Sequence, residues 1–213
     1  VNVDGSGCCG SSVLHVGDKE QAMALARRNV EAWMREIDGA GLDAIVINAS
    51  GCGTTVKDYA ALLADDPAWR DRAARVAGLA RDVSEVMVEI GLANVTPMPL
   101  TVAYHAACSM QHGQKLIEPP KRLLREAGFT VRDVPESHLC CGWAGTYQVL
   151  QPDLSRRLRD RKVANIESLR PDVIAAGNFG CIGNIAGGTG LPVVHTVELL
   201  DWATGGPRPA ALG

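Results

Sequence analysis

The chain has 213 residues, a formal net charge of −3, 46% hydrophobic residues and 21% charged residues, which is typical of a globular protein. The absence of a basic stripe and the presence of only two Phe and three Tyr argue against nucleic-acid binding, and no apolar run approaches the roughly 20 residues of a membrane-spanning helix. Seven cysteines, an odd number, in a chain of this size argue against a secreted disulfide scaffold and predict a reducing, cytoplasmic location.

The first half of the chain predicts a helix followed by a short strand. Apolar residues recur with helical period over 22–37, with Asp18 as the N-cap and Gly39 as a stop signal. The unbroken apolar run 45–47 is typical of a strand buried on both faces of a parallel sheet. A long helical region is then expected over 67–90.

The second half alternates strands with helices. The Pro-rich stretch 96–99 breaks the chain, so we expect a domain boundary there. Alternation of this kind predicts an α/β fold with parallel sheets. The expected strands are 100–104, 129–134, 173–175 and 191–194, and the expected helices are 120–127, 152–169 and 197–202.

The tripeptide Cys-Cys-Gly occurs twice, and a further cysteine follows each copy at a similar distance. The first set is Cys8, Cys9 and Cys52, and the second is Cys140, Cys141 and Cys181. Each set lies in the order loop, helix, strand, loop, which indicates a duplicated domain. Cys52, Cys108 and Cys181 each follow a predicted strand, at the sheet edge where open α/β folds bind ligands. These three positions are therefore candidates to converge on one face.

Adjacent cysteines favour an iron–sulfur cluster over a single zinc ion. Zinc ligands usually come as pairs separated by two to four residues, whereas neighbouring thiolates suit a cluster of several irons. The following glycine lets backbone N–H groups approach the sulfurs. Cys108, Cys140, Cys141 and Cys181 thus form a complete candidate set, while the first half offers three thiols. Buried structural thiols, a vicinal disulfide and a zinc site remain alternatives.

Several stretches resemble the CCG-domain family, and the iron–sulfur subunit of glycolate oxidase (glycolate dehydrogenase) in particular. The resemblance covers essentially the whole chain, and the stretches that carry it are 104–114, 139–147, 177–181 and 194–202. The resemblance implies two pseudo-symmetric Rossmann-like CCG domains: 1–96, lacking its N-terminal part, and 97–204, followed by a flexible tail, 205–213. In heterodisulfide reductase-type members the motif ends in C-x-x-C. Here the second cysteine of that pattern is replaced, because Asn184 stands three residues after Cys181 and Thr55 three residues after Cys52.

The resemblance further implies a role and partners. The seven cysteines would bind [4Fe-4S] clusters, of cubane or non-cubane form, in an electron-transfer subunit that is not catalytic alone. FAD would lie on a partner subunit that oxidises a 2-hydroxy acid, and electrons would pass to a quinone-linked acceptor. Peripheral association with the inner face of the membrane is compatible with this role. A heterodisulfide reductase-like or lactate-utilisation protein with thiol chemistry, and a zinc or metal-free interaction scaffold, are the alternatives.

Histidines and tryptophans near the cysteines are secondary candidates. His105, His112 and His138 flank the predicted ligands, and His15 follows the first pair. Each of these four histidines could donate a hydrogen bond to a cluster sulfur or relay protons. The alternative for each is an ordinary core or surface histidine. We expect His195 to be structural. The four tryptophans are expected to pack in the core, with Trp143 shielding the second pair from water.

Overall fold

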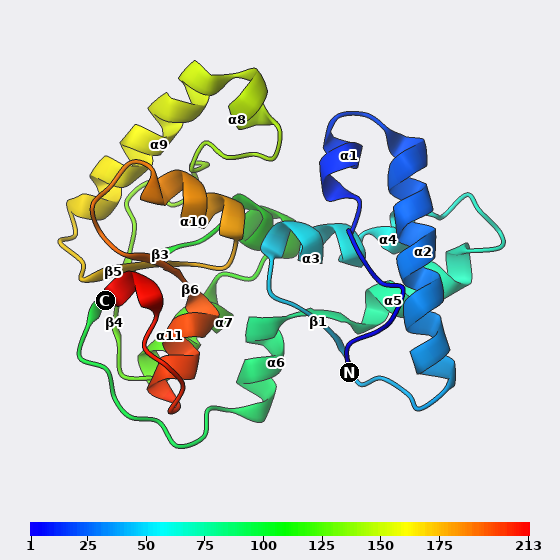
Figure 1. Ribbon diagram of the computed structural model, residues 1–213, viewed down its shortest axis with the longest axis horizontal. Helices are drawn as coiled ribbons and strands as arrows, with labels where there is room; N and C mark the ends of the chain where they lie inside the picture. The colour runs from blue at the N-terminus through cyan, green and yellow to red at the C-terminus, as the bar shows by residue number, and fades with distance from the viewer. The chain divides into compact units, whose positions relative to one another are not determined.

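The structure, a computed structural model, describes residues 1–213 and divides into two compact units, Val1–Val83 and Ser84–Gly213 (Figure 1). The predicted boundary at 96–97 lies inside the second unit, because Met87 and Val88 pack against the hydrophobic core of that unit. None of the helices combines the length and the apolar character needed to cross a membrane.

The first unit is built around helix α2, which the sequence predicted closely. Asp18 caps this helix, since its side chain accepts a hydrogen bond from the backbone N–H of Gln21 at 3.0 Å. Strands β1 and β2 pair in parallel and form a two-stranded sheet. The elements of this unit are α1 (Ser11–His15), α2 (Lys19–Asp38), β1 (Ile45–Ile47), α3 (Ser50–Lys57), α4 (Tyr59–Leu62), α5 (Arg70–Leu79) and β2 (Ala80–Asp82).

Two predictions for the first unit are wrong. The expected long helix over 67–90 is interrupted by β2, because Ala80–Asp82 pairs with β1 and this tertiary pairing overrides local helix propensity. Strand β1 is also not buried on both faces: Val46 is 52% exposed, since the sheet has only two strands. The helix resumes as α6 (Val83–Ile90).

The second unit contains a four-stranded parallel sheet in the order β4-β3-β5-β6. Every residue of β5 is buried, as its unbroken apolar run predicted. The α/β class with parallel sheets is therefore confirmed. The elements are β3 (Thr101–His105), the π-helix η1 (Ser109–Gln114), α7 (Glu118–Glu126), β4 (Thr130–Asp133), α8 (Tyr147–Leu150), α9 (Pro152–Glu167), β5 (Val173–Ala176), α10 (Phe179–Ala186), β6 (Val193–His195), α11 (Thr196–Ala203) and the 3₁₀ helix η2 (Ala210–Leu212).

Helices cover both faces of this sheet. On one face, Leu123 of α7 and Leu199 of α11 pack with Val173 of β5. On the other, Ile166 of α9 and Ile185 of α10 pack with Ala103 of β3 and Ile174 of β5. Figure 1 shows α7 and α11 on one side of the sheet and α9 and α10 on the other. Alternate strand residues point to opposite faces, which is why neighbours in β5 enter different cores.

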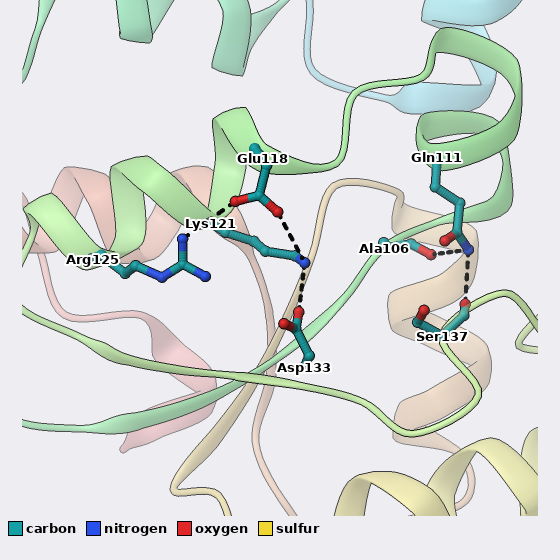
Figure 2. A network of polar contacts seen from close by, with 7 residues as sticks. All are labelled: Ala106, Gln111, Glu118, Lys121, Arg125, Asp133 and Ser137. Atoms are coloured by element: carbon teal, nitrogen blue, oxygen red, sulfur yellow. Dashed lines mark hydrogen bonds and ion pairs between the residues drawn. The ribbon is translucent and has the colours of Figure 1, made fainter.

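Two peripheral segments are held by polar or cation–π contacts. The ammonium of Lys121 on α7 pairs with the carboxylates of Glu118 and of Asp133 on β4, as Figure 2 shows. The segment 205–213, predicted to be loose, packs on the core of the second unit through Leu212. The Arg208 guanidinium carbon lies 5.7 Å from the centroid of the Trp202 ring, which is a cation–π contact.

Candidate functional site

The cysteines of the second unit lie at the carboxyl edge of its sheet. Cys108 follows β3, and Cys181 lies on α10, which follows β5. Strands β3 and β5 are parallel neighbours whose last residues, His105 and Ala176, are paired in register. The two cysteines therefore start from the same edge, as the sequence predicted for a ligand site in this fold class.

The structure brings the four thiols of this unit into one continuous set. Side-chain hydrogen bonds link Cys108 to Cys140, Cys140 to Cys141, and Cys141 to Cys181. Cys141 and Cys181 are buried, and the other two are partly buried. All four are free thiols in this structure.

The thiols shift one another's acidity because they share protons. The hydrogen bond from Cys108, together with the one from Cys141, lowers the pKa of Cys140 far below its usual range. The hydrogen bond from Cys141 likewise lowers the pKa of Cys181. The pKa values of the donors Cys108 and Cys141 are raised in turn. The site thus favours the thiolate form, which binds metals, at Cys140 and Cys181, while Cys108 and Cys141 hold the shared protons.

The glycine after the second cysteine pair is required by its surroundings. Its backbone N–H donates to Cys140 Sγ at 3.3 Å, and Gly142 has a positive φ of 96°. A Cβ on Gly142 would lie 2.3 Å from the carbonyl oxygen of Ser155 on α9. The Ser155 hydroxyl also donates to the Gly142 carbonyl at 2.8 Å. The first turn of α9 therefore fixes the backbone of the cysteine pair.

The start of α10 is organised around Cys181. The Asn178 side chain caps this helix by accepting hydrogen bonds from the N–H groups of Gly180 and Cys181, at 3.0 and 3.4 Å. The Asn184 amide donates to the Cys141 carbonyl at 2.7 Å and so ties α10 to the cysteine pair. Trp143 packs with the buried cysteines and covers Gly180 so closely that a Cβ there would lie 2.3 Å from the indole Nε1.

A π-helix positions the remaining cysteine. Cys108 is the N-cap of η1, and π-helical turns often occur at functional sites. Gln111 of η1 donates through Nε2 to the carbonyls of Ala106 and Ser137, at 3.2 and 2.8 Å (Figure 2). Since Ser137 lies in the loop that leads to Cys140, this amide joins the two cysteine-bearing segments.

A buried lysine faces the thiols, and the sequence reasoning missed it. Lys162 on α9 is 1% exposed, and its ammonium donates to the Glu136 carbonyl at 2.9 Å. Burial lowers the pKa of Lys162, while the nearby thiol charges of Cys141 and Cys140 act in the opposite direction. The signal was present in the sequence, because Lys162 lies at helical spacing between the apolar Leu158 and Ile166.

The histidines divide into one buried group and several peripheral ones. His105 is 2% exposed, and a ring nitrogen of its imidazole lies within 4.8 Å of the Cys181 sulfur. His15, His112 and His138 are exposed, and the ring Nε2 of His112 lies 3.3 Å from the His138 carbonyl oxygen. His195 is structural, as predicted, since its Nδ1 caps α11 by accepting from the N–H of Val197 at 3.1 Å.

The first unit holds a smaller set of thiols. Cys9 is buried and hydrogen-bonds to Cys52, which lowers the pKa of Cys52, while Cys8 is exposed. The buried Tyr59 hydroxyl donates to the Cys9 carbonyl at 2.9 Å and accepts from Asn29 Nδ2 at 3.0 Å. The first unit therefore also packs its cysteine pair in a core. It contains three cysteines, and its one histidine is the exposed His15.

Comparison with known proteins identifies similar chains. The chain is 41% identical over 199 residues to the glycolate oxidase iron-sulfur subunit of Escherichia coli (strain K12), covering 93% of this chain and 49% of that protein. It is 30% identical to the "Probable glycolate oxidase iron-sulfur subunit" of Bacillus subtilis (strain 168), covering 93% and 46%. It is 28% identical to lactate utilization protein A of Bacillus licheniformis, covering 93% and 84%.

These matches bear out the resemblance that the sequence motifs indicated. The chain spans about half the length of the two glycolate oxidase subunits. The family model of the cysteine-rich domain, CCG, matches residues 1–57 and 102–186, which include all seven cysteines. The chain belongs to the CCG cysteine-rich domain family, with one matched segment in each half of its duplicated fold.

Proposed function

We propose that this chain is the iron–sulfur, electron-transfer part of a flavin-dependent 2-hydroxy-acid dehydrogenase of the glycolate oxidase type. The observation that carries the proposal is the continuous set of four thiols formed by Cys108, Cys140, Cys141 and Cys181. The names of two similar proteins, each an iron-sulfur subunit of glycolate oxidase, support the same role.

The residues of the second unit fit an iron–sulfur cluster. Thiolates are the ligands that such clusters take, and the site lowers the pKa of two of its four thiols. The Gly142 N–H already donates to a ligand sulfur, and hydrogen bonds of this kind tune cluster potentials. The buried Lys162 supplies positive charge against the thiolates. When bound, the cluster would accept and release single electrons.

The protein's own part is ligation, positioning and exclusion of water. The contacts of Asn178 and Gln111 fix the segments that carry Cys181 and Cys108 before any ligand binds. Trp143 packs over the buried side of the site. A preorganised site of this kind limits the structural change that accompanies electron transfer. Flavin and substrate would lie on a partner subunit, and a quinone-linked acceptor would receive the electrons on the cytoplasmic side of the membrane.

The partner decides which hydroxy acid is oxidised. The similarity to a lactate utilization protein, of which the chain covers 84%, favours lactate oxidation as the second candidate. With either glycolate or lactate as the substrate of the partner, this chain would have the same electron-transfer role. Reduction of the cluster by a flavin-containing partner subunit, with glycolate or lactate as the electron source, would distinguish them.

Anaerobic reconstitution with iron and sulfide tests the role of the four thiols. The wild-type chain should retain about four irons and four sulfides, and Cys140→Ser should lose most of both. Cys8→Ser is the matched control, because Cys8 occupies the same place in the other Cys-Cys-Gly motif and is exposed; it should retain the wild-type iron content. Full iron retention by Cys140→Ser would refute the ligand assignment.

A further inference from the structure

The strongest unexplained group at the site is the imidazole of His105. It is the last residue of β3, and it is 2% exposed. Its position in the sheet, paired with Ala176 of β5, places it at the edge from which Cys108 and Cys181 extend. The strand therefore directs a buried histidine to the same edge as the predicted ligands.

The donor atoms of His105, Cys141 and Cys181 lie within 4.8 Å of one another, and all three residues are buried. Nε2 of His105 has no hydrogen-bond partner. A buried polar nitrogen without a partner costs about 1–3 kcal/mol, so this orientation needs an explanation. The exposed His112 differs from His105, because its ring Nε2 already has a polar neighbour, the His138 carbonyl oxygen at 3.3 Å.

The spacing of these three donors matches coordination of one metal ion. Metal–sulfur bonds of about 2.3 Å and metal–nitrogen bonds of about 2.0–2.1 Å allow two donors on one ion to lie at most about 4.5 Å apart. The three donor atoms lie within 4.8 Å of one another, so only a small adjustment would bring them within reach of one ion.

We propose that His105 is a nitrogen ligand of the cluster and binds the iron nearest Cys141 and Cys181. The inference rests on the proposed function, since it requires that the four cysteines hold a cluster. The set then contains four anionic thiolates and one neutral imidazole. One iron of the cluster differs from the others in its ligands, which gives the cluster a chemically distinct corner.

Mössbauer spectroscopy of the full chain reconstituted with ⁵⁷Fe tests this assignment without relying on activity. The wild-type spectrum should contain one iron site distinct from the rest, and His105→Ala should lose that component. Pulsed EPR of the reduced protein labelled with ¹⁵N-histidine should show a strongly coupled nitrogen that is absent from His105→Ala. His112→Ala is the matched control and should retain both signals.

The outcomes separate this inference from the proposed function. If the wild-type chain binds no iron, both fail. If the cluster forms but wild type and His105→Ala give the same Mössbauer spectrum, only the ligand role of His105 is overturned. His105→Asn keeps a polar side chain at the strand end and separates loss of the ligand from loss of the fold. Its circular dichroism spectrum should match that of the wild type, while its Mössbauer spectrum should still lack the distinct iron component.

Discussion

At the scale of single residues, buried charge is the feature that most affects the candidate site. Lys162 is almost fully buried and faces thiols that carry negative charge. Isolated buried ammonium groups are strongly disfavoured, so such groups are usually paired with an opposite charge. The Glu136 carbonyl satisfies one of its N–H groups, and the thiolates provide the opposite charge. Lys162 therefore links the stability of α9 to the ionisation of the site.

Replacing Lys162 with Met should lower the reduction potential of the cluster. Reduction adds negative charge, and a nearby positive charge stabilises that state by an amount on the order of tens of millivolts. Potentiometric titration monitored by EPR measures the change. Lys121→Met is a control, because this other buried lysine is already paired with Glu118 and Asp133. An unchanged potential in Lys162→Met would show that the ammonium does not act on the cluster.

At the scale of elements, helices α9 and α10 hold the cysteine-bearing loops in place. Ser155 of α9 fixes the backbone of the cysteine pair through Gly142, and Asn184 of α10 fixes it through the Cys141 carbonyl. The sequence predicted α9 from its helical period and β5 from its unbroken apolar run, but it placed Cys181 in a loop, where the structure has helix α10. It failed for 67–90, where β2 interrupts the expected helix, because strand pairing with β1 is a contact between segments distant in the chain.

Gly142→Ala should destabilise the second unit and weaken cluster retention. The positive φ costs about 1–3 kcal/mol for a residue with a side chain, and the new Cβ would also meet the Ser155 carbonyl at 2.3 Å. Chemical denaturation and iron analysis measure both effects. Gly183→Ala on α10 is the matched control, since nothing lies within 4 Å of its added Cβ. It should be neutral or gain up to about 1 kcal/mol of helix stability. Equal stability of the two variants would contradict this account of Gly142.

At the scale of the whole molecule, the duplicated pattern gives two unequal donor sets. In the first unit, helix α3 carries Cys52 after β1, as α10 carries Cys181 after β5 in the second. The second unit combines four thiols with a buried imidazole. The first unit has two thiols that contact each other, those of Cys9 and Cys52, and a third, that of Cys8, which is exposed.

The chain should therefore bind one cluster, in the second unit. Cys141→Ser should abolish iron retention, whereas Cys9→Ser should leave the iron content per chain unchanged. The two residues are matched in being the buried second cysteine of each motif. Iron and sulfide analysis after anaerobic reconstitution measures the difference. A loss of half the iron in Cys9→Ser would instead show that both units bind clusters.

The sequence by itself determined the α/β class, the long helices α2 and α9, the strands of the second unit, the duplication and the number of cysteines. These features depend on local periodicity and residue type, so the motif around Cys140 and the run 173–175 were sufficient to predict them. Only the tertiary structure decided that Cys108 meets Cys140, that His105 joins Cys141 and Cys181, and that Lys162 is buried beside them. Such contacts arise where parallel strands and packed helices bring distant segments to one sheet edge, and no spacing along the chain specifies them.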